Sequence, residues 1–350
     1  MALQFFDGFE GALRSTPWIT QTNAIVQAGV GRFGSWGLRN HDSNTMSARC
    51  SVAASTLKTI GVAYRADSSM FGLAGNGIVL LISGGTTHLV VTAAATTGII
   101  QLRLGSTTGT ILQTSPGSVA ISHLQYAYVE VRATIADSGG TCIVKVNGVE
   151  AINYTGDTKN AGTTTTIDEI GFAATSVISG GYVYWDDFYV LDGTDATAAT
   201  GRPDNTFLGD VRVEALRPNG NGALSQWVGS DGNSTDNYLL VDEVPANATD
   251  YTGTATAGNR DLWTLEDVTA GAQAVFGVQP IYVVQKSDSG AASVKFIARD
   301  SGGTVSQLGS TLVLGTTFAH TSPGTFPTKP AGGAWSVADV NGMQLGIELA

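Results

Sequence analysis

Short segments that alternate apolar and polar residues constrain the fold of this chain more than any other feature of its sequence. They recur about every 8 to 15 residues between Gly, Ser, Thr or Asp, which is the spacing of strands and turns in a sandwich or barrel. Clear examples are 60–65, 77–83, 88–92, 99–104 and 126–133. Each has the length of a strand, and no long helical pattern competes with them. We therefore expect an all-β fold.

The composition also favours strands and turns over helices. Of the 350 residues, 45 are glycine and only 13% are charged. Helix surfaces are normally rich in Glu and Lys, yet this chain has eight Glu and six Lys, whereas Thr and Val are frequent throughout. The hydrophobic share of 43% is that of a globular chain rather than a disordered one.

A break in the alternating pattern divides the chain into two predicted domains. Residues 194–206 lose the alternation and gather small and turn-forming residues around Pro203. Strand-like segments stand on both sides of this break. The sequence therefore predicts two β-sandwich, jelly-roll-like domains, 1–193 and 207–350, joined by a short linker at 194–206.

Charge and hydropathy exclude two classes of partner. The net charge is −11, and no run of three or more Lys and Arg could neutralise a phosphate backbone, so nucleic-acid binding is not expected. No segment approaches the roughly 18 uninterrupted apolar residues of a membrane span. The N-terminus lacks the basic and apolar regions of a signal peptide, so we expect folding in the cytosol that makes the chain.

The chain contains two cysteines, Cys50 and Cys142. A pair so far apart in sequence can lie on neighbouring strands and form a disulfide, or lie far apart in the fold. Of these alternatives, we predict two buried free thiols.

The first predicted domain resembles the concanavalin A-like, or laminin G-like, jelly roll. The resemblance covers about residues 3–193. It depends on five segments in a characteristic order, which are the opening Phe5–Glu10, the turn Gly31–Ser35, a hairpin at Asn147–Gly148, and the closing segments Ile167–Ile170 and Tyr182–Val190. The Asn-Gly pair of the hairpin tolerates the positive φ angles of a type I′ turn. The resemblance implies a two-sheet sandwich for this part of the chain.

The second part of the chain resembles a module that is common in virion proteins of tailed bacteriophages. The segments that carry this resemblance are Phe207–Pro218, Asp261–Thr264 and Trp335–Asn341. In those proteins the module usually follows a lectin-like domain. The resemblance implies that the protein is made in the host cytoplasm and located in the virion.

Catalytic motifs are lacking. Glucanases with a jelly roll carry a Glu-x-Asp-x-x-Glu spacing that places an acid and a nucleophile on one face of a strand, and this sequence does not contain it. Neighbouring residues on a strand point to opposite faces, so adjacent acids are not expected to act on one bond. The adjacent acidic pairs are Asp168-Glu169, Asp186-Asp187 and Asp242-Glu243. Zinc-protease spacing and a serine-nucleophile elbow are also missing. We predict that the protein is not an enzyme.

Two weaker hypotheses concern binding. Laminin G-like domains often hold calcium at the rim of the sandwich, and Asp7, Asp186 and Asp187 are candidate ligands. The alternative is that these acids are solvated or bonded to loop amides, and no cofactor other than calcium is expected. For glycan binding, Trp36 and Trp227 are the candidate exposed platforms because they stand among Gly and Ser. The other tryptophans that the sequence places clearly are Trp185 and Trp263, which we assign to cores.

These observations favour a non-enzymatic structural protein on the outside of a tailed phage virion. Such a protein would be a head decoration, a head spike or a tail appendage, docked on capsid or tail proteins. Its low-charge surface, rich in Gly and Thr, suits packing against neighbouring subunits, and we expect a homo-oligomer, with a trimer as one arrangement. The alternative function is a receptor-binding, lectin-like module that recognises a host surface glycan.

Overall fold

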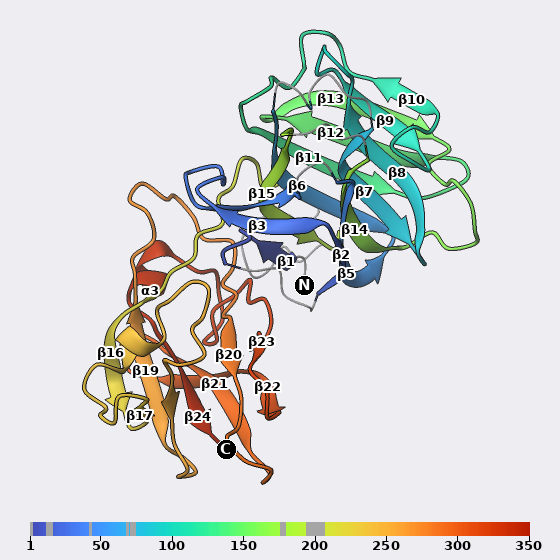
Figure 1. The fold of residues 1–350 in the computed structure, drawn as a ribbon. Helices are drawn as coiled ribbons and strands as arrows, with labels where there is room; N and C mark the ends of the chain where they lie inside the picture. The colour runs from blue at the N-terminus through green and yellow to red at the C-terminus, as the bar shows by residue number, and fades with distance from the viewer. Residues whose placement is uncertain are drawn as a thin grey trace. The chain divides into compact units, whose positions relative to one another are not determined.

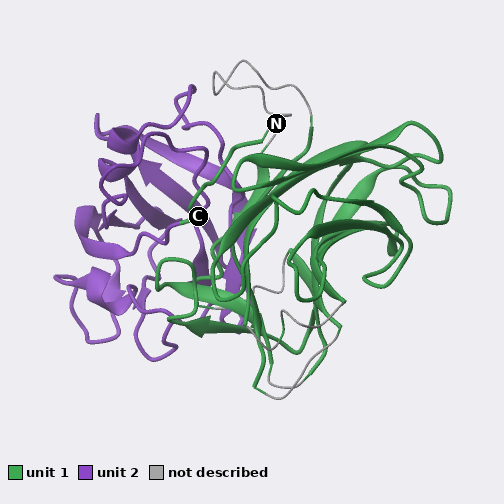
Figure 2. Cartoon of the chain, turned by 90° about the horizontal axis from the view of Figure 1, so that it is seen from above, with its two compact units in different colours: residues 1–197, 203–213 green, residues 198–202, 214–350 purple. Residues whose placement is uncertain are grey.

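The protein is nearly all β, and its chain divides into two compact units. The computed structural model describes residues 3–11, 17–41, 44–67, 70, 75–175, 180–193 and 207–350. The first unit takes in residues 1–197 and 203–213, and the second takes in 198–202 and 214–350 (Figures 1 and 2). The predicted linker at 194–206 lies outside the described residues. Within the described residues, no helix has both the length and the apolarity needed to cross a membrane.

Unit 1 is a sandwich of two antiparallel sheets. The eight-stranded sheet, called sheet A, runs in the order β13 (Val149–Gly156), β12 (Gly140–Val146), β11 (Ala127–Thr134), β6 (Leu57–Ala66), β15 (Val183–Leu191), β4 (Trp36–Asn40) and β3 (Ala24–Ala28), and β1 (Leu3–Asp7) also pairs with β15. The last strand thus pairs with the first, which brings the two ends of this unit together (Figure 1). This arrangement confirms the predicted jelly-roll sandwich.

The seven-stranded sheet B faces sheet A across the core. Its order is β10 (Ile111–Thr114), β9 (Ile100–Leu104), β8 (Thr86–Ala93), β7 (Asn76–Ser83), β14 (Ile167–Ala174), β5 (Met46–Ser55) and β2 (Trp18–Thr22). Alternate residues of both sheets fill the space between them, as the period of two in the sequence requires.

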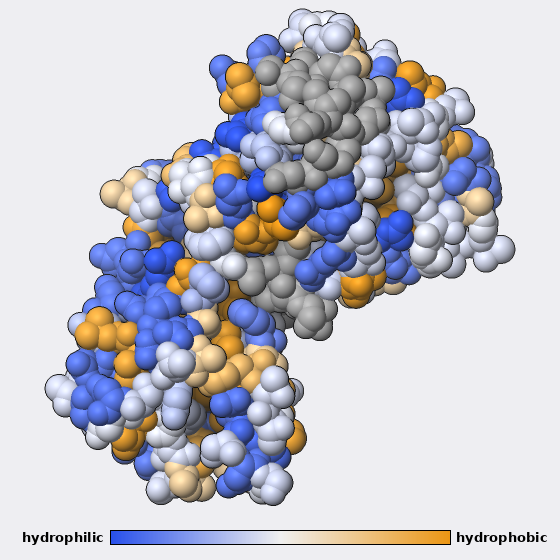
Figure 3. Space-filling model, viewed as in Figure 1, coloured by the Kyte–Doolittle hydropathy of each residue, from blue (hydrophilic) through white to orange (hydrophobic). Residues whose placement is uncertain are grey.

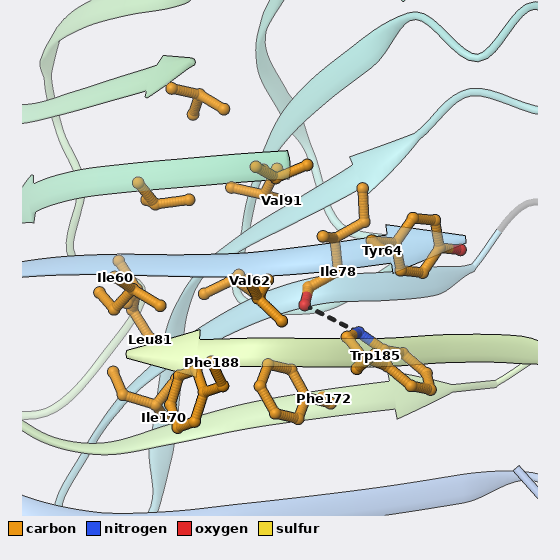
Figure 4. Close-up of a cluster of buried hydrophobic side chains, with 14 of the residues drawn as sticks. Ile60, Val62, Tyr64, Ile78, Leu81, Val91, Ile170, Phe172, Trp185 and Phe188 are labelled. Atoms are coloured by element: carbon orange, nitrogen blue, oxygen red, sulfur yellow. Dashed lines mark hydrogen bonds between the residues drawn. The ribbon is translucent and has the colours of Figure 1, made fainter. Parts of the chain in front are cut away.

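Aromatic side chains dominate the centre of this core. Phe172 of sheet B packs edge to face on Phe188 of sheet A, with ring centroids 5.1 Å apart (Figure 4). The Trp185 indole is fully buried, and its Nε1 donates a 3.1 Å hydrogen bond to the backbone oxygen of Ile78. This bond satisfies the one polar atom of the indole and links the two sheets.

Two further expectations for unit 1 are confirmed. The Asn147–Gly148 turn joins β12 to β13, and both residues have positive φ, 49° and 80°. Cys50 and Cys142 are buried free thiols. Burial raises the pKa of the Cys142 thiol to about 12, which keeps it protonated and unreactive.

Unit 2 is built on a five-stranded antiparallel sheet. Its order is β16 (Pro218–Ser225), β19 (Arg260–Leu265), β24 (Gln344–Leu349), β21 (Ser293–Arg299) and β22 (Val305–Val313). Two short ribbons accompany it, β17 (Val228–Gly229) with β18 (Thr252–Gly253), and β20 (Tyr282–Val284) with β23 (Ala319–Thr321). The main core cluster includes Trp227, Trp263, Phe296 and Ile347.

Two short helical segments complete unit 2. They are the 3-10 helix η1 (Asn237–Leu240) and the helix α3 (Val337–Asn341). α3 begins at a capping box, in which the Ser336 hydroxyl accepts from the Asp339 backbone N–H while the Asp339 carboxylate accepts from the Ser336 backbone N–H.

The boundary between the units differs from the predicted one. Residues 207–213 belong to unit 1, so the long segment of unit 2 begins at Glu214 rather than at Phe207. The alternating pattern of this segment predicted a strand, yet residues 207–217 form none. Their polar backbone groups bind side chains of sheet A instead, as described next.

Candidate functional site

A bulge in β15 places two buried carboxylates side by side on the outer face of sheet A. The pairing of β15 with β6 shifts register between Asp186 and Tyr189, and Asp187 has a φ of 50°. The extra residue interrupts the alternation of side chains. The backbone N–H of Arg32 donates to Asp186 Oδ2 at 2.7 Å, and Arg32 Nη1 donates to Asp187 Oδ2 at 3.3 Å. The expectation that these adjacent acids point to opposite faces is therefore wrong.

All four oxygens of this pair accept hydrogen bonds from the protein. Besides the two bonds from Arg32, Asp186 Oδ1 accepts from the backbone N–H of Asp187 at 2.8 Å. Asp187 Oδ1 accepts from the backbone N–H of Val213 at 2.7 Å. Both residues are only 1% exposed. Burial raises the pKa of Asp186 to about 8 and that of Asp187 to about 6, because it disfavours the ionised forms, and the Asp187 charge further raises the pKa of Asp186.

Arg32 links the carboxylate pair to the segment Phe207–Val213, which we call the strap. Its guanidinium forms an ion pair with Asp210 and donates to the backbone oxygen of Val211 at 3.2 Å. It also lies 5.3 Å from the centroid of the Tyr128 ring. One cation therefore holds both the bulge and the strap through charge-assisted bonds.

A second anchor holds the other end of the strap. Glu130 Oε1 accepts from the Gly209 backbone N–H at 2.8 Å and from the Tyr189 hydroxyl at 2.5 Å. The Tyr189 oxygen in turn accepts from the Leu208 backbone N–H at 3.1 Å. Burial raises the pKa of Glu130. The backbone donors of the strap thus find acceptors on sheet A, which explains why this segment forms no strand.

Gly61 makes room for this second anchor. A Cβ at Gly61 would lie 2.1 Å from Cε1 of the Tyr189 ring, so only glycine lets the ring lie flat against β6 at this point. Nearby, Lys145 Nζ stands 4.4 Å from the ring centroid of Phe207. The outer face of sheet A is therefore shaped to receive the strap.

The three predicted calcium ligands are not gathered into one metal site. Asp7 Oδ1 accepts from the Phe9 backbone N–H at 2.7 Å, and Asp7 Oδ2 accepts from Trp18 Nε1 at 2.9 Å. All six oxygens of Asp7, Asp186 and Asp187 thus face N–H groups, whose positive ends oppose a cation at the same position. Across the described ranges, no group of three or more His, Cys, Asp and Glu could hold a metal ion. The structure instead shows the alternative to calcium binding, in which these three acids are bonded to backbone amides and other donors.

The two candidate glycan platforms lie in different units. Trp36 is half-buried in β4. Trp227 is only 8% exposed and belongs to the core of unit 2, where its Nε1 donates to the backbone oxygen of Asn259 at 3.0 Å. Its expected exposure is wrong, because Gly and Ser neighbours mark a turn without showing what the ring packs on. Trp185 and Trp263 are buried as predicted.

Part of the outer face of sheet B is covered by the chain itself. Leu80, Ile82, Val90 and Ala173 form a buried apolar cluster there. The loop between β9 and β10 reaches the end of β14, because Thr107 Oγ1 lies 3.1 Å from Thr175 Oγ1. This part of the face is therefore occupied, whereas Ser51 and Ala53 of β5 are exposed.

Comparisons with known proteins give only distant likeness. No family model matches the chain. No curated protein matches it either. Three similar solved structures are the cellulose-induced protein Cip1 (14% identity, 53% of this chain and 96% of that chain, TM-score 0.39), the alginate lyase Aly36B (14%, 44% and 80%, 0.34) and a carbohydrate esterase from the Shiga toxin-encoding bacteriophage phi24B (10%, 54% and 99%, 0.36). At these TM-scores, no activity is carried over to this chain.

Proposed function

We propose that the protein is a non-enzymatic structural component of the exterior of a tailed phage virion, which assembles with copies of itself and docks on capsid or tail proteins. The virion location is supported by the resemblance of Phe207–Pro218, Asp261–Thr264 and Trp335–Asn341 to a virion module. The non-enzymatic role is supported by the carboxylate pair.

The observation that carries the non-enzymatic role is that every carboxylate oxygen of Asp186 and Asp187 accepts a hydrogen bond from within the protein. Two carboxylates whose pKa values are pushed apart are a common arrangement for acid and base catalysis. A catalytic carboxyl group must, however, reach a substrate proton. Here both groups are 1% exposed and hold the backbone in place. The two carboxylates therefore serve to hold the backbone rather than to act on a substrate.

The surface supports docking against other proteins. Large apolar side chains are exposed among polar ones, as the mixed colours of Figure 3 show. β22 forms an edge of the five-stranded sheet, and its sequence VSQLGSTLV has no charged residue and no proline. Val313 at its end is 76% exposed. Edge strands that stay exposed to solvent usually carry charged residues or proline, which prevent pairing with another chain. Because β22 has neither, its edge is suited to pairing with a neighbouring subunit.

Light scattering of the purified chain tests self-assembly. We expect a mass of two or more whole multiples of 36.0 kDa at micromolar concentration. Val313→Lys places a charge at the β22 edge and should shift the mass toward the monomer. Leu239→Lys, at an exposed position of η1 in the same unit and away from the sheet edge, is the matched control and should not. A monodisperse 36.0 kDa species at all concentrations would contradict the proposal.

A further inference from the structure

A row of arginine and tyrosine side chains crosses interior strands of sheet A on its outer face. Tyr184 of β15 pairs with Arg39 of β4 on one side and with Arg65 of β6 on the other. Their sequence neighbours Tyr64 and Trp185 belong to the core, so the row points away from it.

Arg65 is held between two aromatic rings. Its guanidinium carbon lies 3.9 Å from the ring centroid of Tyr184 and 5.3 Å from that of Tyr126. Both rings are fixed by their hydroxyls, because Tyr126 Oη donates to the backbone oxygen of Val30 at 2.7 Å and Tyr184 Oη donates to Asp67 Oδ2 at 3.3 Å. The guanidinium plane is therefore oriented before any ligand arrives.

Arg65 lacks an acidic partner in the part of the chain that the structure describes. None of the ion pairs found there includes it. Its Nε is buried and makes no hydrogen bond. Asp67, two residues further along the chain, accepts from Tyr184. A partly buried arginine whose side-chain partners are tyrosines rather than an acid is notable in a protein whose net charge is −11.

The chemistry of this row selects its ligand. A planar guanidinium binds a carboxylate through two parallel N–H bonds. Arg39 supplies a second cation two strands away, roughly 10 Å at the usual strand spacing. It stacks on Tyr182 at 4.2 Å, while its Nε donates to Gln27 Oε1 at 2.5 Å and its Nη1 donates to the backbone oxygen of Asn40 at 2.8 Å. Two cations beside aromatic rings suit an extended ligand with repeated acid groups. The row crosses interior strands, so a peptide could not add to it as an extra strand.

We propose that Arg65, with Tyr126 and Tyr184, binds a carboxylate of an acidic polysaccharide laid across the outer face of sheet A. Nothing in this proposal depends on the architectural role, since a chain that binds no glycan can still be a virion component. The position of the site differs from both sequence candidates, because Trp227 lies in unit 2 and Trp36 is on β4 outside the row.

Calorimetric titration tests the proposal with tetragalacturonate as the probe and its methyl ester as the uncharged control ligand. The wild-type chain should bind the acid and not the ester, and binding should weaken as NaCl is raised. Arg65→Gln should weaken binding at least about tenfold. Arg65→Lys should weaken it less, because lysine keeps the positive charge but lacks the two parallel N–H donors of the guanidinium. Arg132→Gln is the matched control, since Arg132 lies on β11 of the same sheet and also has a buried Nε without a partner. It should bind like the wild type.

Three results would overturn the proposal. They are no binding of tetragalacturonate by the wild-type chain, equal binding by Arg65→Gln, and Arg65-dependent binding of poly-glutamate that matches the acidic sugar. Thermal melting of each variant checks folding. If Arg65→Gln is destabilised, the discrimination between acid and ester by the wild-type chain and by Arg65→Lys still decides the outcome.

Discussion

Asp187 Oδ1 accepts a 2.7 Å hydrogen bond from the backbone N–H of Val213, which lies 26 residues further along the chain. This bond joins the bulge of the last strand of unit 1 to the last residue of the strap. Arg32 makes the same connection from the other side, through Asp187 and Asp210. The carboxylates that the sequence offers as metal ligands thus fix the course of the chain where it leaves the sandwich.

Replacing Asp187 with asparagine should destabilise unit 1. An amide keeps an acceptor for Val213 but presents an N–H group to Arg32 Nη1, so two donors face each other where a hydrogen bond stood. We expect the free energy of unfolding to fall by about 2 kcal/mol, as is usual when a buried donor loses its acceptor. Urea denaturation followed by tryptophan fluorescence measures it. Asp137→Asn, at a side chain 76% exposed in an ion pair with Lys159, should change it by less than about 0.5 kcal/mol.

The stability of unit 1 should fall as the pH rises from about 5 to 8. Folding raises the pKa of Asp187 to about 6 and of Asp186 to about 8, above the unfolded value of about 3.9. The folded chain then binds more protons than the unfolded chain over this range. The contribution of the pair is fully present below about pH 4 and is lost as the pH passes through both folded values.

Melting temperatures at pH 5 and pH 8 measure this effect. The wild type should lose about 10 °C more than a double variant in which Asp186 and Asp187 are both asparagine. Other groups titrate in both proteins, so only the difference between them counts. An equal loss would show that the pair has ordinary pKa values.

Gly61→Ala should loosen the strap. The new methyl group would lie 2.1 Å from the Tyr189 ring, so the ring must move and its bonds to Glu130 and Leu208 must break or lengthen. A loss of about 2 kcal/mol is expected for such overpacking. Hydrogen exchange at the Leu208 and Gly209 amides should speed up. Gly117→Ala, where a Cβ meets nothing within 4 Å, should leave that exchange unchanged.

Trp227→Ala should unfold or strongly destabilise unit 2. The indole is 8% exposed and packs in the main core cluster of that unit, so a loss of about 3 to 5 kcal/mol is expected. Calorimetry should show a lower transition for unit 2. Val228→Ala, at a neighbouring side chain that is 52% exposed, should have little effect. If Trp227→Ala melted like the wild type, the indole would not be a core residue.

The sandwich of unit 1 was predictable because its strands keep a period of two over most of their length. The Asn147–Gly148 hairpin was predictable for a local reason, since both residues adopt the positive φ that this pair favours. Both features depend on residues that are close together in the sequence, so they can be recognised from the sequence alone.

The carboxylate site was not predictable in the same way. The bulge at Asp186 and Asp187 depends on how β15 pairs with β6, and alternation along one strand does not reveal it. The only local signal is an aspartate, a residue that tolerates positive φ, next to a second acid in an aromatic strand. The strap was misassigned because Phe207–Val213 alternates like a strand while its backbone partners, Glu130 and Tyr189, are distant in sequence.

The most direct measurement of the proposed virion role is the copy number of this chain in phage particles purified from a culture that produces it. Quantitative mass spectrometry across a density gradient would compare its peptides with those of the major capsid protein. A structural component should follow the particles at a fixed ratio to the capsid protein, even after a high-salt wash. A chain that is absent from the particles, or that varies independently of them, would contradict the account.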